Sequence, residues 1–195
     1  MGVGLVQRWR RLARTVEGWN VTEAELAAPH PASAHVPAGG RRFLRAVDVD
    51  ADAAVVFRWL CQLKVAPYSY DLVDNLGRRS PRTLTPGADD LELGQRFLIG
   101  PLVDFERDHH LVLVASPAGE RVFGPVAMSY EVVPGLAARS RIVAEVAVGP
   151  PRGRPRGPAR AADRLWQSFL GAGDLVMLRR QLLTLRSLAE GAPRR

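Results

Sequence analysis

Short runs of β-branched and aromatic residues, separated by Gly, Pro or Asp, fill the middle of the chain. This pattern is typical of antiparallel strands joined by tight turns. It predicts a first strand over Arg41 to Asp48. Long strands in hairpin order then predict a curved antiparallel sheet, and these later strands are expected over Gln95 to Ile99, Leu102 to Phe105, His109 to Ala115, Arg121 to Val133 and Arg139 to Val148.

The last predicted hairpin divides its residues between two faces. A turn centred on Leu136 would set Glu131 opposite Arg141 and Tyr130 opposite Ile142. Since neighbouring residues of a strand point to opposite faces, the charged pair then lies on one face. The other face is apolar and is expected to face the core; it carries Met128, Tyr130, Val132, Ile142, Ala144 and Val146.

Other stretches carry hydrophobic residues at helical spacing. Residues 55–63 follow the cap region Asp-Val-Asp-Ala-Asp and place Val56, Leu60 and Leu63 on one side. Residues 160–170, which include Trp166, form a second predicted helix that ends at glycine. The last helix is predicted from an N-cap at Asp174 to about Ala189. Its apolar stripe is suited to a concave sheet and consists of Leu175, Leu178, Leu182, Leu185 and Ala189.

Residues 1–40 are expected to form an N-terminal arm. The main domain would then span residues 41–190 and leave a tail at 191–195. A short helix could start at Thr22, but the prolines and glycines between residues 29 and 40 are expected to prevent regular structure afterwards. The arm would wrap the domain, and Trp19 would either anchor it or lie exposed at the contact of a homodimer.

Residues 67–82 concentrate aromatic and polar groups in a non-helical segment directly after the first helix. Tyr68 and Tyr70 stand close to Asp71, Asp74 and Asn75. Ligand pockets are mostly apolar with a few polar groups that fix orientation, and this mixture is typical of the lip of such a pocket. In the alternative interpretation, the acids and the asparagine cap turns while the tyrosines are ordinary core residues.

Three segments together carry a family resemblance: the first helix with its loop Tyr68-Ser69-Tyr70-Asp71, the strand at 124–134 and the C-terminal segment at 173–185. They resemble the START-like helix-grip superfamily, also called SRPBCC, and its bacterial polyketide cyclase/dehydrase-like branch. The resemblance implies an α+β helix-grip fold, in which a curved antiparallel sheet wraps around a long C-terminal helix with an internal cavity. It also implies a hydrophobic small-molecule ligand, for which the candidate binding residues are Tyr68, Tyr70, Asp71, Asp74, Asn75, Met128, Tyr130, Trp166 and Met177.

The resemblance leaves several functions open. The first hypothesis is binding of a lipid-like or polyketide-like molecule without catalysis. The second is a polyketide cyclase or dehydrase, whose cavity folds a reactive chain while a Tyr or Asp moves protons. The third is a structural or interaction module with a closed cavity. Catalysis would need a polar pair deep in the pocket, and the predicted inner strand faces are apolar apart from Tyr130, so binding is favoured.

The formal net charge of +7 raises the question of nucleic-acid binding. Nearly all of the positive charge is arginine, since Lys64 is the only lysine. The basic segment at 151–158 is rich in Pro and Gly, which is typical of a solvated loop. No aromatic residue that could stack on bases lies between residues 131 and 165. A nucleic-acid partner is therefore not expected.

Further patterns bear on location and chemistry. No run approaches the ~20 apolar residues of a membrane-spanning helix, so a cytoplasmic protein without membrane insertion is expected.

Cys61 lies in an apolar helix and is expected to be a buried, unreactive thiol. His109 and His110 are adjacent on a predicted strand and should point to opposite faces, which would exclude joint binding of one metal ion. Phosphate-binding and dinucleotide-binding motifs are absent from the sequence, so no metal or other cofactor is expected.

Overall fold

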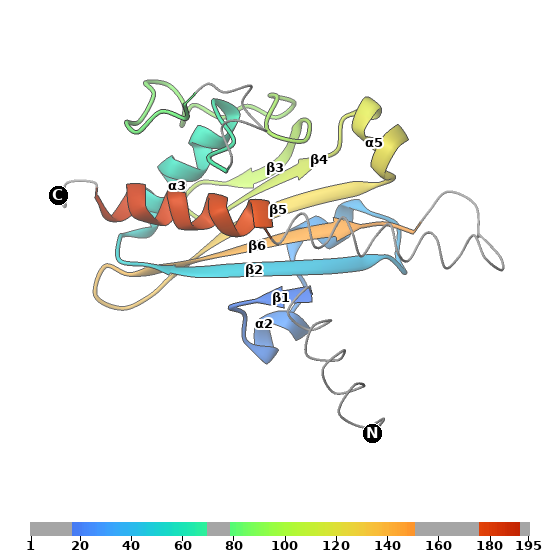
Figure 1. Ribbon diagram of the computed structural model, residues 1–195, viewed down its shortest axis with the longest axis horizontal. Helices are drawn as coiled ribbons and strands as arrows, with labels where there is room; N and C mark the ends of the chain where they lie inside the picture. Colours follow the sequence, from blue (N-terminus) through green and yellow to red (C-terminus); the bar gives the residue numbers. More distant parts are fainter. Residues whose placement is uncertain (1–16, 70–78, 151–175, 192–195) are drawn as a thin grey trace.

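The computed structural model describes residues 17–69, 79–150 and 176–191, and its centre is a curved sheet (Figure 1). The strand order is β1-β2-β6-β5-β4-β3, with every pairing antiparallel except the parallel contact of β1 with β2. The strands are β1 (Gly18–Trp19), β2 (Arg41–Val49), β3 (Leu102–Glu106), β4 (His110–Val114), β5 (Val126–Pro134) and β6 (Ser140–Val148).

Two helical segments cover the inner face of this sheet. The first is α3 (Ala53–Cys61), continued by a 3-10 turn η2 (Gln62–Lys64), and it buries the predicted residues Val56, Leu60 and Leu63. The second is the C-terminal helix, described over residues 176–190, which lies against the sheet (Figure 1). The predicted start of this helix at Asp174 and the predicted helix at 160–170 lie outside the described residues.

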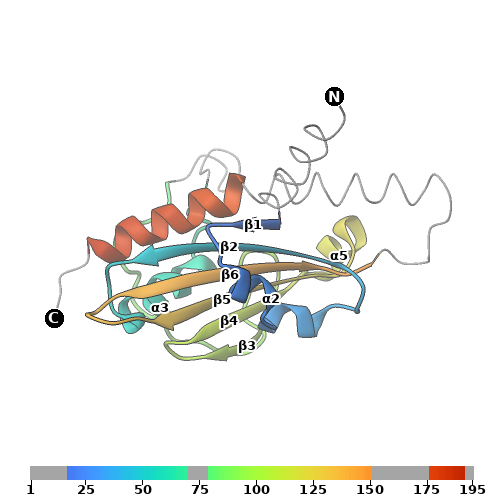
Figure 2. The same ribbon diagram turned by 90° about the horizontal axis from the view of Figure 1, so that it is seen from below.

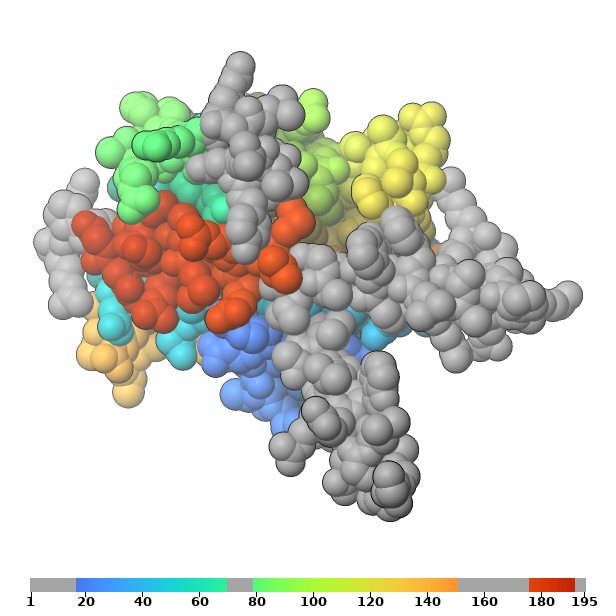
Figure 3. Space-filling view, viewed as in Figure 1, coloured from blue at the N-terminus to red at the C-terminus, as the bar shows by residue number. Residues whose placement is uncertain are grey.

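The C-terminal helix is amphipathic in the way its sequence predicts. Leu178, Leu182, Leu185 and Ala189 are buried in the same cluster as the inward side chains of β5 and β6. The opposite side of the helix forms part of the molecular surface (Figure 3). This grip of a helix by a curved sheet confirms the predicted α+β helix-grip fold. Among the residues that the structure describes, none belongs to a helix with the length and apolar character needed to cross a membrane.

Alternation along the strands sends one set of side chains inward and the other outward. The predicted inner set is confirmed, because all of its members lie in the main core cluster: Met128, Tyr130, Val132, Ile142, Ala144 and Val146. Each fully buried Leu, Ile or Val side chain stabilises the fold by roughly 1.5–3 kcal/mol relative to exposure. The inner face is therefore the main source of stability.

The described part of the arm adds a short strand to the edge of the sheet and covers the outer face with its helical segments (Figure 2). It contains β1, helix α2 (Glu23–Ala27) and a 3-10 helix η1 (Pro31–His35). Thr22 caps α2 in a capping box with Glu25, as its position suggests. The expectation of no regular structure after Pro29 is wrong, since Pro31 begins η1; a proline is tolerated in the first turn of a helix, where its missing N–H is not needed.

Two predicted strands differ from the observed elements. Residues 95–99 form a tight turn instead of a strand, in which Phe97 N–H donates to Gly100 O and one isolated bridge joins Arg96 to Pro101. The segment 121–123 belongs to α5 (Pro117–Phe123), and the strand starts at Val126. Residues that commonly begin and end helices flank α5 in the sequence. Ser116 accepts a hydrogen bond from Gly119 N–H at the start of the helix, and Gly124 ends it with φ of 80°.

The register of the β5–β6 hairpin also differs from its prediction. Tyr130 pairs with Ala144 and Glu131 with Val143, so Glu131 is not opposite Arg141. The turn centres on Ala137, and Ala137 and Ala138 both have φ of 56°. This shift moves each partner by two residues, and an even shift leaves every side chain on its predicted face.

Candidate functional site

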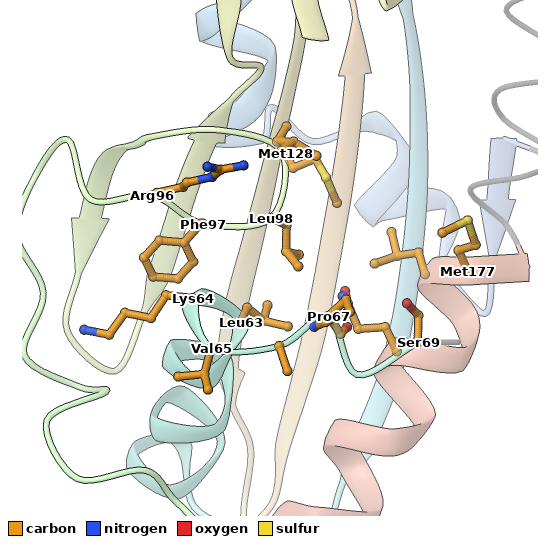
Figure 4. Close-up of a pocket in the computed structure, with 14 residues that line it drawn as sticks. Leu63, Lys64, Val65, Pro67, Ser69, Arg96, Phe97, Leu98, Met128 and Met177 are labelled. Atoms are coloured by element: carbon orange, nitrogen blue, oxygen red, sulfur yellow. Dashed lines mark hydrogen bonds between the residues drawn. The ribbon is translucent and has the colours of Figure 1, made fainter. Parts of the chain in front are cut away.

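An apolar cavity lies between the C-terminal helix, the segment after η2 and the inner face of β5. Its volume is about 560 Å³, which falls in the range of small-molecule sites. The side chains come from separate parts of the chain and surround the same space (Figure 4). The lining residues are Leu63, Lys64, Val65, Ala66, Pro67, Ser69, Arg96, Phe97, Leu98, Ile99, Met128, Met177, Leu178 and Gln181.

A second apolar cavity of about 410 Å³ lies next to the first, under α5. Phe123 of α5 and Phe43 of β2 contribute to its walls. Leu98, Ile99 and Met128 line both cavities, so the two spaces lie on either side of the same three side chains. A rearrangement of these side chains would change the volume available in both.

Gln181 is the polar centre of the first cavity. Tyr130 Oη donates a hydrogen bond of 2.6 Å to Gln181 Oε1, and Gln181 Nε2 donates to Pro67 O. Gln181 and Tyr130 are both buried. One amide side chain therefore joins the C-terminal helix to β5 and to the segment that follows η2.

The other polar residues of the lining have different surroundings. Lys64 Nζ donates to the carbonyl oxygens of Gly87 and Asp90, at 3.2 and 2.8 Å. Arg96 is exposed. Among the described lining residues there is no carboxylate, imidazole or thiol, and the polar side chains of the lining are the amide of Gln181, the hydroxyl of Ser69 and the cations of Lys64 and Arg96.

The only cysteine lies close to this region but is not in the lining. Cys61 is fully buried in α3. Burial raises the pKa of its thiol to about 12, and the negative charge of Asp89 adds to this effect. A thiol with so high a pKa carries almost no thiolate at neutral pH and is a poor nucleophile.

The structure distributes the candidate binding residues unevenly. Met128 and Met177 line the first cavity, and Tyr130 meets it through Gln181. Tyr68 is buried in the core, where its ring packs edge-on against Trp59 at 6.3 Å between centroids, and it is not among the cavity-lining residues. The remaining candidates lie outside the described residues: Tyr70, Asp71, Asp74, Asn75 and Trp166.

Sequence reasoning missed several residues of the site. Gln181 interrupts the apolar stripe of the last helix, and a polar residue in such a position is a usable signal for a buried hydrogen bond. Arg45 lines neither cavity, but it is a further buried polar residue that sequence reasoning missed, and alternation along β2 places it on the inner face with Phe43 and Val47. It is fully buried, and its Nη1 donates to Leu44 O at 2.8 Å. Leu98 and Ile99 were not recognised as lining residues because the sequence predicted a strand where the structure has a turn.

The prediction that His109 and His110 point apart is wrong. β4 begins at His110, and His109 belongs to the preceding turn, in which Asp108 has φ of 64°. The alternation rule applies only within a strand. The two rings therefore meet, with 3.1 Å between their Nδ1 atoms.

Comparisons with known proteins find similarity only among solved structures. No family model matches the chain, and no curated protein matches its sequence. Solved structures that resemble it include truncated norcoclaurine synthase from Thalictrum flavum, with 13% identity over 78% of this chain and 95% of that chain, at a TM-score of 0.47. They also include Ara h 8.0201, with 9% identity over 79% and 100% of the two chains, at a TM-score of 0.40.

A third similar structure is the di-domain ARO/CYC BexL from the BE-7585A biosynthetic pathway. Its identity is 17% over 80% of this chain and 52% of that chain, at a TM-score of 0.40. At such low identity the similarity concerns the fold, and the fold assignment here rests on the chain's own sheet order and gripped helix.

Proposed function

We propose that this protein binds a hydrophobic small molecule, lipid-like or polyketide-like, in the cavity beneath its C-terminal helix and does not transform it. The observation that carries the proposal is the apolar cavity of about 560 Å³ with a buried Tyr130–Gln181 pair at its wall. Apolar walls supply most of the binding free energy, and a few polar groups fix the orientation of a ligand.

The adjoining cavity extends the space available to a ligand. Because Leu98, Ile99 and Met128 line both cavities, a long apolar molecule could contact both if these side chains move. Met128 is unbranched and adapts its shape easily. An elongated, flexible ligand therefore fits the arrangement better than a compact, highly polar one.

A polyketide cyclase or dehydrase is the competing proposal. It would require a general acid or base within about 3 Å of the reacting group. In the described walls, the hydroxyl of Tyr130 is held by a neutral amide, which neither removes nor supplies a proton at neutral pH. Asp71 and Asp74, which lie outside the described residues, are the carboxylates that the sequence proposes for this role, and raised pKa values of these groups would favour the enzyme.

The experiment is a fluorescence titration with the neutral naphthalene probe prodan, combined with native mass spectrometry of the freshly purified protein. Leu98 is the residue to change, because it lines both cavities and lies in a turn. Leu98→Trp should occupy the space and weaken probe binding at least tenfold. Mass spectrometry should show a co-purifying small molecule in the parent protein and less of it in the variant.

Leu93→Trp is the matched control. It makes the same change in the same loop region, and Leu93 is 65% exposed. The control should bind the probe like the parent protein. Equal affinities for the two variants, or a parent protein that binds neither probe nor co-purifying molecule, would contradict the proposal.

A further inference from the structure

The turn between β3 and β4 gathers several potential metal ligands. Glu106 is the last residue of β3, and His110 is the first of β4. His109 N–H donates to Glu106 O at 3.0 Å and closes the turn, with Asp108 in the left-handed region at φ of 64°. Such a turn brings the side chains at positions i, i+3 and i+4 to one side of the hairpin. None of these residues lines the cavities described above.

Three side-chain atoms at this turn form a nearly regular triangle. His109 Nδ1 lies 3.1 Å from His110 Nδ1 and 3.5 Å from Glu106 Oε2, and His110 Nδ1 lies 3.9 Å from Glu106 Oε2. A triangle with these sides has a centre about 2 Å from each corner, and zinc bonds to histidine nitrogen and carboxylate oxygen are also about 2.0–2.2 Å long. The three atoms are thus spaced as ligands of one ion.

Asp104 orients one of the two histidines. His110 Nε2 lies 3.1 Å from Asp104 Oδ2, and a carboxylate accepts a hydrogen bond from this nitrogen. With the proton of a neutral imidazole on Nε2, its Nδ1 carries the lone pair that faces His109. This is the arrangement in which metal-binding histidines are commonly held by a second carboxylate.

We propose that Glu106, His109 and His110 form a site for a divalent transition metal ion, with Zn²⁺ as its preferred occupant. Imidazole and carboxylate ligands suit zinc and similar ions of intermediate softness better than Mg²⁺ or Ca²⁺, which favour sites made of oxygen. Three protein ligands leave at least one coordination position for water or for a group from another molecule. Glu106 and His109 are 68% and 55% exposed, so ions can reach the site from solvent.

The test is a Zn²⁺ titration of the tag-free, chelator-treated protein in competition with a chromophoric chelator, repeated with Co²⁺ to record its d–d absorption. We expect one strong site per chain. His109→Ala should weaken Zn²⁺ binding at least tenfold, and Asp104→Asn should weaken it by about tenfold through the orientation of His110. Both residues are largely exposed, so these variants should fold like the parent protein.

His35→Ala is the control for nonspecific binding to surface histidine, since His35 is exposed in η1. It should leave the affinity for Zn²⁺ unchanged. Ring resonances of His109 and His110 should shift on addition of Zn²⁺ while those of His35 remain. A parent protein without a strong site, or a strong site that His109→Ala does not weaken, would overturn the proposal.

Discussion

Single polar side chains have large roles in this apolar core. Gln181 satisfies two groups from distant parts of the chain, the hydroxyl of Tyr130 and the carbonyl of Pro67. A buried polar group without a partner costs about 1–3 kcal/mol, whereas the same group with a partner contributes a modest gain. The stability of the cavity wall therefore depends on this one amide.

Replacing Gln181 with Ala should destabilise the protein by about 1–3 kcal/mol, because the buried hydroxyl of Tyr130 and the half-buried carbonyl of Pro67 would each lose the hydrogen bond to this amide. Urea-induced unfolding would measure the change. Ser187→Ala is the matched control on the exposed side of the same helix and should change stability by less than about 0.5 kcal/mol. Equal effects of the two substitutions would show that the Gln181 network does not support the fold.

Cys61 should not react with thiol reagents while the protein is folded. Burial raises the pKa of this thiol to about 12, and only the thiolate attacks such reagents. Mixing with dithiobis-nitrobenzoate at mildly alkaline pH should release no colour from the native protein and one equivalent in concentrated guanidinium chloride. Rapid reaction of the native protein would mean that α3 opens easily.

Elements are held together by charge on the outer face and by apolar packing on the inner one. On the outer face, Arg141 Nε donates to Glu25 Oε1 at 2.6 Å, and Arg42 and Ser33 both donate to the buried Glu145. His30 bridges Glu131 Oε1 and Glu25 O, at 2.6 and 2.9 Å. Because a carboxylate and a carbonyl oxygen both accept, this bridge is complete when both nitrogens of His30 carry a proton.

The attachment of the arm should consequently weaken at alkaline pH. The hydrogen bond to Glu131 raises the pKa of His30 above 6.5. A raised folded-state pKa gives stability that is complete below the unfolded value and is lost as pH rises through the folded value. The stability difference between the parent protein and His30→Gln should therefore shrink from about pH 6 to pH 9.

Urea-induced unfolding at several pH values would measure that difference, with His35→Gln as the control from the same arm. His35 is exposed, so its replacement should change stability by less than about 0.5 kcal/mol. A His30→Gln difference that is constant or grows toward alkaline pH would exclude the charged bridge.

The C-terminal helix depends on its apolar stripe. Leu182 is fully buried, and its neighbour Leu183 is 36% exposed. Leu182→Ala should cost about 2–5 kcal/mol of unfolding free energy, because it removes buried contacts and leaves a cavity. Leu183→Ala should cost less than about 1 kcal/mol. Thermal and urea unfolding would compare the two, and similar losses would contradict the observed helix orientation.

At the scale of the whole molecule, the gripped helix leaves two adjoining apolar spaces within one core. A ligand that binds only the folded protein stabilises it by mass action, by about 2.7 kcal/mol at a free concentration 100 times Kd. For a chain of this size, this corresponds to an increase in Tm of roughly 5–10 °C.

A hydrophobic ligand found by native mass spectrometry should therefore raise the Tm of the parent protein and of Leu93→Trp by this amount, as measured by differential scanning calorimetry. Leu98→Trp should show a much smaller increase at the same ligand concentration. An increase of equal size in Leu98→Trp would place the binding site outside the two cavities.

The sequence alone predicted those features that depend on local periodicity. Alternation identified the inward set from Met128 to Val146, and helical spacing identified Leu178, Leu182 and Leu185 as the buried stripe. The two-residue repeat of a strand and the 3.6-residue repeat of a helix are set by the backbone. The predicted buried face is therefore correct even where the predicted ends of an element are not. The β5–β6 hairpin illustrates this. Its register differs by two residues from the prediction, so each residue has a different cross-strand partner but remains on the predicted face of the sheet.

The tertiary structure decided everything that depends on which distant or turn residues meet. Tyr130 and Gln181 are 51 positions apart, and only the placement of the helix on the sheet joins them. The contact of His109 with His110 follows from a left-handed residue at Asp108, which no hydrophobic pattern records. The periodicity of the side chains determines which face of a strand or helix a residue occupies. Turn conformation and packing determine which other residues it contacts, and a binding site is formed by such contacts.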